Sequence, residues 1–266
     1  MDAKPTLARR RADLHVRLDG ASKPGGGDDG ADPARAGGDA RVGVYDGLKE
    51  ALASGLIMPG QSITIRAVAK AFGTSTMPAR EALNRLRAEG VLSASDGKSM
   101  TVPVLSEADL DEIRWIRRAI EGQAAALAAG RITPSEIKHL AAAFRTMERL
   151  EDSGSSIKER QEFLRLNRSF HFGIYRASRA ETAMRIIEGL WTRIGPYFNL
   201  LSLHKSRNYG QDNHHRMLET VRAGDADGCR RAVEDDIDGG CALLQELIRD
   251  LRNFPGLSGT ATFGDG

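Results

Sequence analysis

Polar side chains recur along one face of a short helix that the sequence predicts near residue 80. Counting in helical steps from Thr76 places Arg80, Asn84 and Arg87 on the same face. An arginine can bond the O6 and N7 atoms of guanine together, and Thr or Asn can reach base edges or phosphates. The opposite face is apolar and carries Ala79, Leu83 and Leu86. The spacing therefore suits a DNA-reading helix, although an ordinary amphipathic helix with a solvated polar face fits it as well.

A second pair of side chains has the spacing of a metal-binding helix. Asn167 and His171 are four residues apart in a segment predicted to be helical, so both lie on one face. An imidazole nitrogen and an amide oxygen can together bind a divalent cation. The alternative is a polar pocket without metal, in which these side chains hydrogen-bond each other, water or a ligand.

The residues around Arg80 predict two helices joined by a tight turn. Thr64 can cap a helix from Ile65 to Phe72, and Gly73 suits the left-handed residue that ends it. Ser75 or Thr76 can then cap the next helix. This order is that of a helix-turn-helix, whose second helix enters the major groove of DNA.

The flanking segments extend this pattern to a winged helix-turn-helix. Apolar residues recur at helical spacing from Val42 to Ser54, and MPGQSIT follows as a turn. Residues 91–104 predict two short strands around Asp96-Gly97, a pair typical of hairpins. Three helices followed by such a hairpin make up the expected DNA-binding domain, which we assign to residues 41–105.

Charge and cysteine content limit the class of protein. Residues 41–105 carry eight Lys and Arg against five Asp and Glu, whereas residues 106–266 carry 23 against 24. The positive excess thus coincides with the winged domain, as phosphate contact requires. Cys229 and Cys241 are the only cysteines and predict no disulfide. No signal peptide or run of about 18 apolar residues is present, so we expect a cytoplasmic protein without a membrane partner.

The rest of the chain predicts a mainly α protein. Residues 1–40 are rich in Gly, Asp and Ala and predict a disordered leader, with Arg9 to Arg11 as a less favoured DNA-gripping arm. Residues 106–252 show helical periodicity without strand patterns, which predicts an antiparallel all-α bundle. Gly195-Pro196 is expected to bend or interrupt one of its helices. Residues 253–266 are expected to form a flexible tail.

Residues 42–104 resemble the winged helix-turn-helix of GntR-type regulators. The resemblance is carried by STMPAREALNRLRAEGVL, with its Ser/Thr-capped helix, its Arg-Glu-Ala-Leu core and a following Leu-x-x-x-Gly. It implies binding of double-stranded DNA, for which we expect a homodimer on an inverted-repeat operator. The expected DNA contacts are Arg66, Ser75, Thr76, Arg80 and Asn84, with Gly97 and Lys98 in the wing. The wing departs from the family, which often has Arg-Gly there.

Residues 106–250 resemble the FCD-type effector domain of the FadR-like subfamily. The matching segments are IRWIRRAIEGQAAALAA, NRSFH and NHHRMLE with the later Gly-Asp. The resemblance implies dimerisation and a small-molecule effector bound between the helices. It places Arg117, with Glu121, in the effector pocket, where the guanidinium would bind an organic acid. The alternative is an ordinary intrahelical ion pair between these two residues, worth a few tenths of a kcal/mol.

Many members of that subfamily bind a divalent metal through an Asp/Asn-x-x-x-His pair and two later histidines. Position by position, this chain offers Asn167, His171 and His214, and it has Asp236 where the family usually has histidine. Two nitrogen and two oxygen donors suit Zn²⁺ or Ni²⁺, or Mn²⁺ with added waters. A metal-free polar pocket stays open as the alternative.

These features favour a DNA-binding transcription regulator, most often a repressor in this family, whose operator binding responds to a carboxylate-bearing metabolite. The main alternative is a metal-dependent helical enzyme using His171 and His214. No general base or nucleophile accompanies that pair in the sequence, so we expect no enzyme activity. A structural DNA-binding protein without a ligand would leave the inward-facing polar residues unexplained.

Overall fold

The computed structural model divides the chain into two compact units, each of which is described by itself. The described residues are 33–94, 99–153, 156–203 and 210–253. The first unit contains the chain up to Ala51 together with Pro59–Pro103. The second contains Leu52–Met58 and the chain from Val104 onward.

Three helices form most of the first unit: α2 (Pro33–Ala53), α3 (Ile65–Phe72) and α4 (Thr76–Ala88). As predicted, the Thr64 hydroxyl caps α3 by accepting from the Ala67 amide at 3.1 Å, and Gly73 ends it with a left-handed φ of 64°. Ser75 precedes α4 with an extended backbone but makes no side-chain cap hydrogen bond. The helix-turn-helix is therefore present, with only its first helix capped as expected.

The start of α2 corrects one boundary of the sequence analysis. The leader was expected to reach residue 40, but α2 begins at Pro33. Proline suits the first position of a helix because its missing N–H has no helical acceptor there. The alanines that follow favour helix extension toward the apolar segment. Residues 1–32 lie outside the described residues.

A three-stranded antiparallel sheet completes the winged fold: β1 (Ser62–Thr64), β2 (Ser93–Ala94) and β3 (Ser99–Thr101). The strand order is β1-β3-β2, with Ser62 and Ser93 both opposite Thr101. The two wing strands were predicted, whereas β1 was read as part of a turn. A three-residue strand has little periodicity of its own, and β1 exists because it pairs with a distant segment. The wing turn at residues 95–98 lies outside the described residues.

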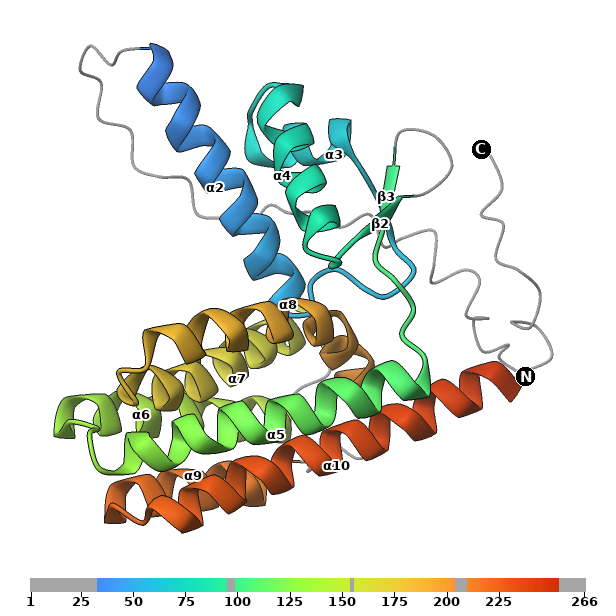
Figure 1. Cartoon of the computed structure of the whole chain (residues 1–266). Coiled ribbons are helices and arrows are strands. Elements are labelled where there is room, and N and C mark those ends of the chain that lie inside the picture. The colour runs from blue at the N-terminus through green and yellow to red at the C-terminus, as the bar shows by residue number, and fades with distance from the viewer. Residues whose placement is uncertain (1–32, 95–98, 154–155, 204–209, 254–266) are drawn as a thin grey trace. The chain divides into compact units, whose positions relative to one another are not determined.

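The second unit is a helical bundle, and its described residues form no strand. Its helices are α5 (Glu107–Ala129), α6 (Pro134–Ser153), α7 (Ile157–Ala177), α8 (Glu181–Leu203), α9 (Gln211–Ala223) and α10 (Ala226–Asn253). Helices α5 and α10 lie side by side along its length (Figure 1). The sequence-based prediction of a winged helix-turn-helix followed by an all-α bundle is thus confirmed.

Two local features fix the helices that carry the site. The first feature is a capping box at the start of two helices, formed by Ser106 and Asp109 in α5 and by Ser156 and Glu159 in α7. Helix α8 runs on through Pro196, so of the bend or interruption expected at Gly195-Pro196 the interruption is absent. One proline removes a single helical hydrogen bond, and buried residues on either side hold the helix in place.

The core of the bundle is large and partly aromatic. Phe170, Phe172, Tyr175 and Trp191 are at most 1% exposed, so four aromatic side chains are fully enclosed in this core. Cys229 and Cys241 are buried free thiols in α10, in agreement with the prediction of no disulfide. Within the described ranges, no helix has the length and apolar character needed to cross a membrane.

Candidate functional site

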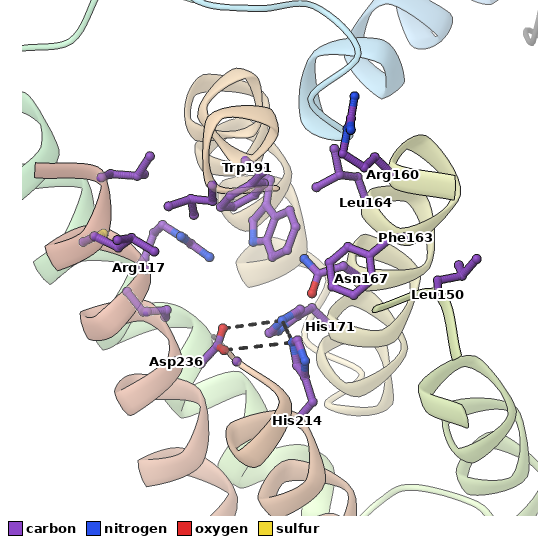
Figure 2. A pocket seen from close by; sticks show the side chains of 18 of the residues that line it. Arg117, Leu150, Arg160, Phe163, Leu164, Asn167, His171, Trp191, His214 and Asp236 are labelled. Carbon is purple, nitrogen blue, oxygen red and sulfur yellow. Dashed lines mark hydrogen bonds and ion pairs between the residues drawn. The ribbon is translucent and has the colours of Figure 1, made fainter. Parts of the chain in front are cut away.

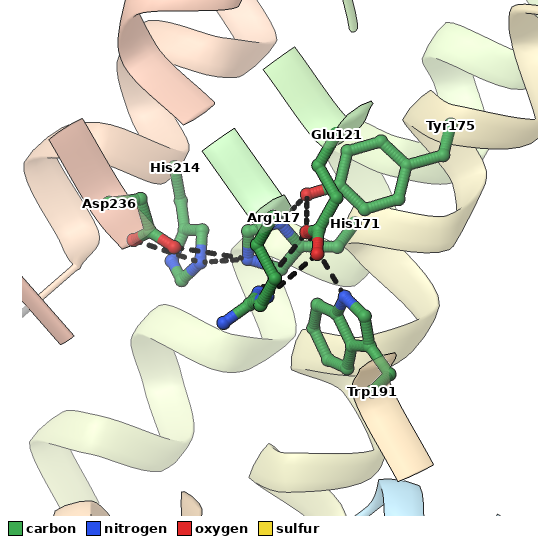
Figure 3. A network of polar contacts seen from close by, with 7 residues as sticks. All are labelled: Arg117, Glu121, His171, Tyr175, Trp191, His214 and Asp236. Carbon is green, nitrogen blue, oxygen red and sulfur yellow. Dashed lines mark hydrogen bonds and ion pairs between the residues drawn. The ribbon is translucent and has the colours of Figure 1, made fainter. Parts of the chain in front are cut away.

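Three potential metal ligands from three helices meet inside the bundle. His171 comes from α7, His214 from α9 and Asp236 from α10 (Figure 3). The two histidine Nε2 atoms are 3.0 Å apart. Oxygens of the Asp236 carboxylate lie 3.6 Å from Nε2 of His171 and 3.9 Å from Nε2 of His214. The structure thereby brings together three of the four ligands expected from the sequence.

The geometry of this cluster fits one divalent cation. With Zn–N bonds of about 2.0–2.1 Å, two nitrogen ligands of one tetrahedral ion lie about 3.3 Å apart. The observed Nε2–Nε2 separation of 3.0 Å is close to that value. The fourth expected ligand, Asn167, is one helical turn before His171 and lines the same cavity. The converging donors are two imidazoles and a carboxylate, which zinc, nickel or manganese accept, and Asn167 is the expected fourth donor.

A buried carboxylate organises the wall behind the cluster. Glu121 is fully buried on α5 and accepts two hydrogen bonds from Arg117, at 2.6 Å from Nε and 3.1 Å from Nη2. It also accepts from the Tyr175 hydroxyl at 2.8 Å and from the Trp191 indole N–H at 3.1 Å (Figure 3). Four donors thus compensate the desolvation of one carboxylate. Arg117 and Glu121 thus form the intrahelical ion pair that the sequence allowed, and both side chains are buried.

This network also sets the proton position on His171. The Tyr175 hydroxyl has a single proton, which it donates to Glu121. Its oxygen lies 3.2 Å from Nδ1 of His171 and is left to accept from that nitrogen. Burial, reinforced by the Glu121 charge, raises the pKa of Tyr175 well above its ordinary value, so the hydroxyl stays protonated. Nε2 of His171 therefore keeps its lone pair and points it into the cluster.

The protonation of the cluster suits ligation. Burial lowers the pKa of His171 well below its ordinary value, with further lowering from His214 and Arg117. Burial also lowers the pKa of His214 to about 4. Both imidazoles are consequently neutral at pH 7, as metal ligands must be. Burial raises the pKa of Asp236 to about 7, so a bound cation would favour its ionised form.

The cluster forms the floor of a cavity of about 130 Å³ (Figure 2). Polar lining residues on this floor are Arg117, Asn167, His171, His214 and Asp236. Glu121 is not among the lining residues, so the sequence-based expectation that it contacts an effector needs correction. A residue at 0% exposure behind Arg117 cannot reach a ligand, and its role is to hold the guanidinium.

Sequence reasoning missed the aromatic members of the site. Tyr175 follows His171 by four residues, so helical spacing could have identified it as a partner of Nδ1. Trp191 lies on another helix, and its contact with Glu121 spans 70 positions. No local pattern in the sequence predicts that bond.

The first unit presents the expected DNA-contacting residues at its surface. Those on α3, on α4 and at the start of α4 are all exposed: Arg66, Ser75, Thr76, Arg80 and Asn84. Gly97 and Lys98 of the wing lie outside the described residues. The neighbouring Arg85 is used differently, because its guanidinium stacks 3.8 Å above the Tyr45 ring and bonds Glu89 at 3.1 Å. Tyr45 in turn donates to Glu89 at 2.7 Å, which ties α2 to α4.

Known families match both units. Residues 40–102 match the gntR family of bacterial regulatory proteins, and residues 112–239 match the FCD domain. The HTH-type transcriptional regulator McbR of Escherichia coli (strain K12) is 30% identical over 208 residues, which cover 76% of this chain and 91% of McbR.

Other relatives and solved structures agree with these matches. The Probable D-xylose utilization operon transcriptional repressor of Paenarthrobacter nicotinovorans is 26% identical over 71% of this chain and 82% of its own length. The solved structure of E. coli McbR/YncC superposes with a TM-score of 0.72 at 29% identity, covering 79% of this chain and 98% of that one. A GntR regulator from Rhodococcus sp. RHA1 shares the fold at 16% identity, with a TM-score of 0.62, over 78% of this chain and 98% of that one.

Proposed function

Since this chain belongs to the gntR family of bacterial regulatory proteins and carries an FCD domain, we propose that it is a repressor whose DNA binding is controlled by a small carboxylate in the bundle cavity. Its matches are transcriptional regulators and not enzymes, which removes the alternative of a metal-dependent helical enzyme. The observation that carries the proposal is the cavity whose floor combines Arg117 with a potential metal cluster. The assignment as a repressor is supported by a relative that bears that name.

We propose that His171, His214, Asp236 and Asn167 hold one divalent metal per chain, with Zn²⁺, Ni²⁺ and Mn²⁺ as the candidates. Electrostatics support a link between this metal and an anionic effector. Arg117 and Glu121 neutralise each other, so the ionised Asp236 alone would repel an anion from the floor. A bound divalent cation would reverse that sign and supply an electrophilic contact for a carboxylate. These residues would then hold the ion, and Arg117 would orient the anion.

Metal content tests this part of the proposal. Protein purified without chelator should contain about one equivalent of metal per chain, as measured by elemental mass spectrometry. His171→Ala should lower that content together with the melting temperature, because a metal that binds the folded state stabilises it. Wild-type protein that contains no metal, and that gains no thermal stability from any of the three ions, would refute the metal site.

We also propose that the protein binds an inverted-repeat operator as a homodimer, since two-fold protein symmetry matches two half-sites. The exposed polar face of α4, with Arg80 and Asn84, supports its role as the reading helix. Sedimentation of the full chain with and without a selected operator measures the stoichiometry. Two chains per operator duplex are expected, and one chain per duplex would contradict the dimer.

Control by an effector is tested by a DNA mobility shift. A carboxylate ligand should release the operator from metal-loaded wild-type protein. Arg117→Ala should keep its metal but need more ligand for the same release, since Arg117 lines the cavity and is not a metal ligand. Release that is unchanged in this variant would remove Arg117 from the effector site. Operator binding that resists every carboxylate would refute an acid as the effector.

A further inference from the structure

One face of α7 lines the cavity from its floor to its outer end. Arg160, Phe163, Leu164, Asn167 and His171 succeed one another at helical spacing, and all five line the cavity (Figure 2). At 1.5 Å of rise per residue, Phe163 and Leu164 lie about 10–12 Å along the helix from His171. The cavity is therefore polar at His171 and Asn167 and becomes apolar about two turns away.

The other helices together line the cavity in the same way, with polar side chains at the floor and apolar ones beyond it. Beyond the floor, apolar side chains of α6, α8 and α10 line the cavity: Leu150, Trp191, Phe198, Leu201, Leu243 and Leu244. The remaining charged lining residues are Glu159 and Arg160 at the start of α7. Glu159 is engaged by Ser156 in the capping box, and Arg160 directs its guanidinium away from the cluster in Figure 2. The middle of the cavity thus offers a ligand contact with hydrocarbon and aromatic rings.

The size of the cavity limits what can fill this apolar part. Its volume of about 130 Å³ is slightly smaller than the roughly 150 Å³ of a protein cavity known to take up benzene. Because this volume also includes the floor, it limits the ligand to a carboxylate with one aromatic ring or a short branched alkyl group. A hydroxylated chain of the same length would bury its polar groups against Phe163 and Leu164 without partners, which is unfavourable.

We infer that the effector is a monocarboxylate with a compact apolar body, either one aromatic ring or a short branched alkyl chain. Its carboxylate lies at the floor near Arg117 and the His171 cluster, and its body contacts Phe163, Leu164 and the facing side of α8. Sugar acids and tricarboxylates are disfavoured because the described residues that line the middle of the cavity are apolar and offer no partner for additional polar groups. This inference rests on the proposed function, in which the floor binds a carboxylate.

A matched series of acids tests the inference on the full-length, metal-loaded protein. Isothermal titration should compare acetate, isovalerate, benzoate and phenylacetate with gluconate and citrate. Affinity should rise about fourfold for each methylene buried, so that phenylacetate binds at least tenfold more tightly than acetate. Gluconate and citrate should bind no more tightly than acetate.

The outcomes separate this inference from the proposed function. If gluconate or citrate binds as tightly as phenylacetate, an apolar body is excluded while a carboxylate effector stands. If none of the six acids binds, the carboxylate effector fails, and the inference fails with it. A preference for the apolar acids supports both.

Variants at Phe163 test where the apolar body lies. Phe163→Gln should reduce the ratio of phenylacetate to acetate affinity at least fivefold, whereas Phe163→Leu, which keeps an apolar wall, should preserve most of it. Acetate affinity and metal content should be unchanged in both, because Phe163 is two turns from the floor. If Phe163→Gln does not fold, Leu201→Gln on α8 replaces it. A ratio that is unchanged in a folded Gln variant would overturn the placement.

Discussion

The Tyr175 hydroxyl on α7 donates a hydrogen bond of 2.8 Å to the Glu121 carboxylate on α5, and the same oxygen lies 3.2 Å from Nδ1 of His171. Tyr175 thereby connects a buried carboxylate to a potential metal ligand. Its contribution is to orient the imidazole and to keep the lone pair on Nε2, since the partner of the second ring nitrogen determines the tautomer.

Removal of that hydroxyl should weaken metal binding without removing a ligand. Tyr175→Phe is expected to lower metal affinity by about 10–100-fold, as is typical for partners behind a histidine ligand. Competition with a chelator of known affinity measures the change. Tyr197→Phe is the control, because this buried tyrosine bonds the Leu105 amide outside the cluster. Equal affinities of wild type and Tyr175→Phe would show that Tyr175 has no such role.

Acid should destabilise the metal-free protein partly through His214. Its pKa is lowered to about 4 in the folded state, from an ordinary value of 6.5. Its stabilising contribution is therefore complete above pH 6.5 and is lost as the pH falls toward 4, by about 1.4 kcal/mol per pH unit. Asp236, whose pKa is raised to about 7, acts in the opposite direction and favours the folded state below that pH.

Because the effects of His214 and Asp236 overlap, the informative quantity is the difference in the free energy of unfolding between wild type and His214→Gln. Urea unfolding of chelator-treated wild type and His214→Gln should be measured from pH 7 to pH 4.5. The free energy of unfolding of the variant is expected to fall less steeply as the pH decreases. The difference in slope is at most about 1.4 kcal/mol per pH unit, which corresponds to one proton. Parallel curves would mean that His214 titrates alike in the folded and unfolded states.

Gly210 should be intolerant of a side chain. Its φ of 97° is a conformation that side chains disfavour, and an added Cβ would lie 3.3 Å from Asp236 Oδ1 and 3.4 Å from His214 Cε1. Gly210→Ala should therefore cost about 1–3 kcal/mol of stability and reduce metal content. Gly130→Ala is the matched control, with a φ of −89° and open space around its Cβ position. If calorimetry finds both variants equally stable, the strain argument at Gly210 is wrong.

Arg80 should contribute to specific DNA binding. If it reads a guanine, Arg80→Ala should cost about 1–3 kcal/mol on the selected operator, with less effect on unrelated DNA. Arg222→Ala removes the same charge from α9 of the second unit and serves as the control. Fluorescence anisotropy at matched salt distinguishes the two. If the Arg80→Ala variant binds its operator with the affinity of the wild type, Arg80 does not read a base.

The sequence predicted those parts of the fold that depend on local signals. Capping residues such as Thr64 and Ser106 mark helix starts because they bond amides within the next three residues. Strand β1 was missed because its hydrogen bonds are to β3, about 37 positions away, and a pairing at that distance leaves no local pattern. At Gly195-Pro196 the sequence predicted a bend or an interruption, and α8 continues because packing of the surrounding residues outweighs the intrinsic preference of proline.

For the site, sequence reasoning identified the residues on the floor better than those on the walls. His171 and Asn167 share one helix face, and His214 and Asp236 stand at positions matched to a known family. The apolar walls come from residues such as Phe163 and Phe198, which look like ordinary core residues in the sequence. Glu121 was assigned to the effector together with Arg117 on the family resemblance, which does not show how deeply a side chain is buried.

The layout of α7 separates two properties along a single helix. Asn167 and His171 serve the floor, whereas Phe163 and Leu164 face the apolar part of the cavity. If the cavity binds the proposed effector, point mutations in the first half of the helix would change which compound is recognised while leaving the candidate metal ligands Asn167 and His171 untouched. After a gene duplication, two copies of this protein could acquire different inducers through one or two codon changes. A helix of this kind allows new specificities to evolve without rebuilding the rest of the sensor.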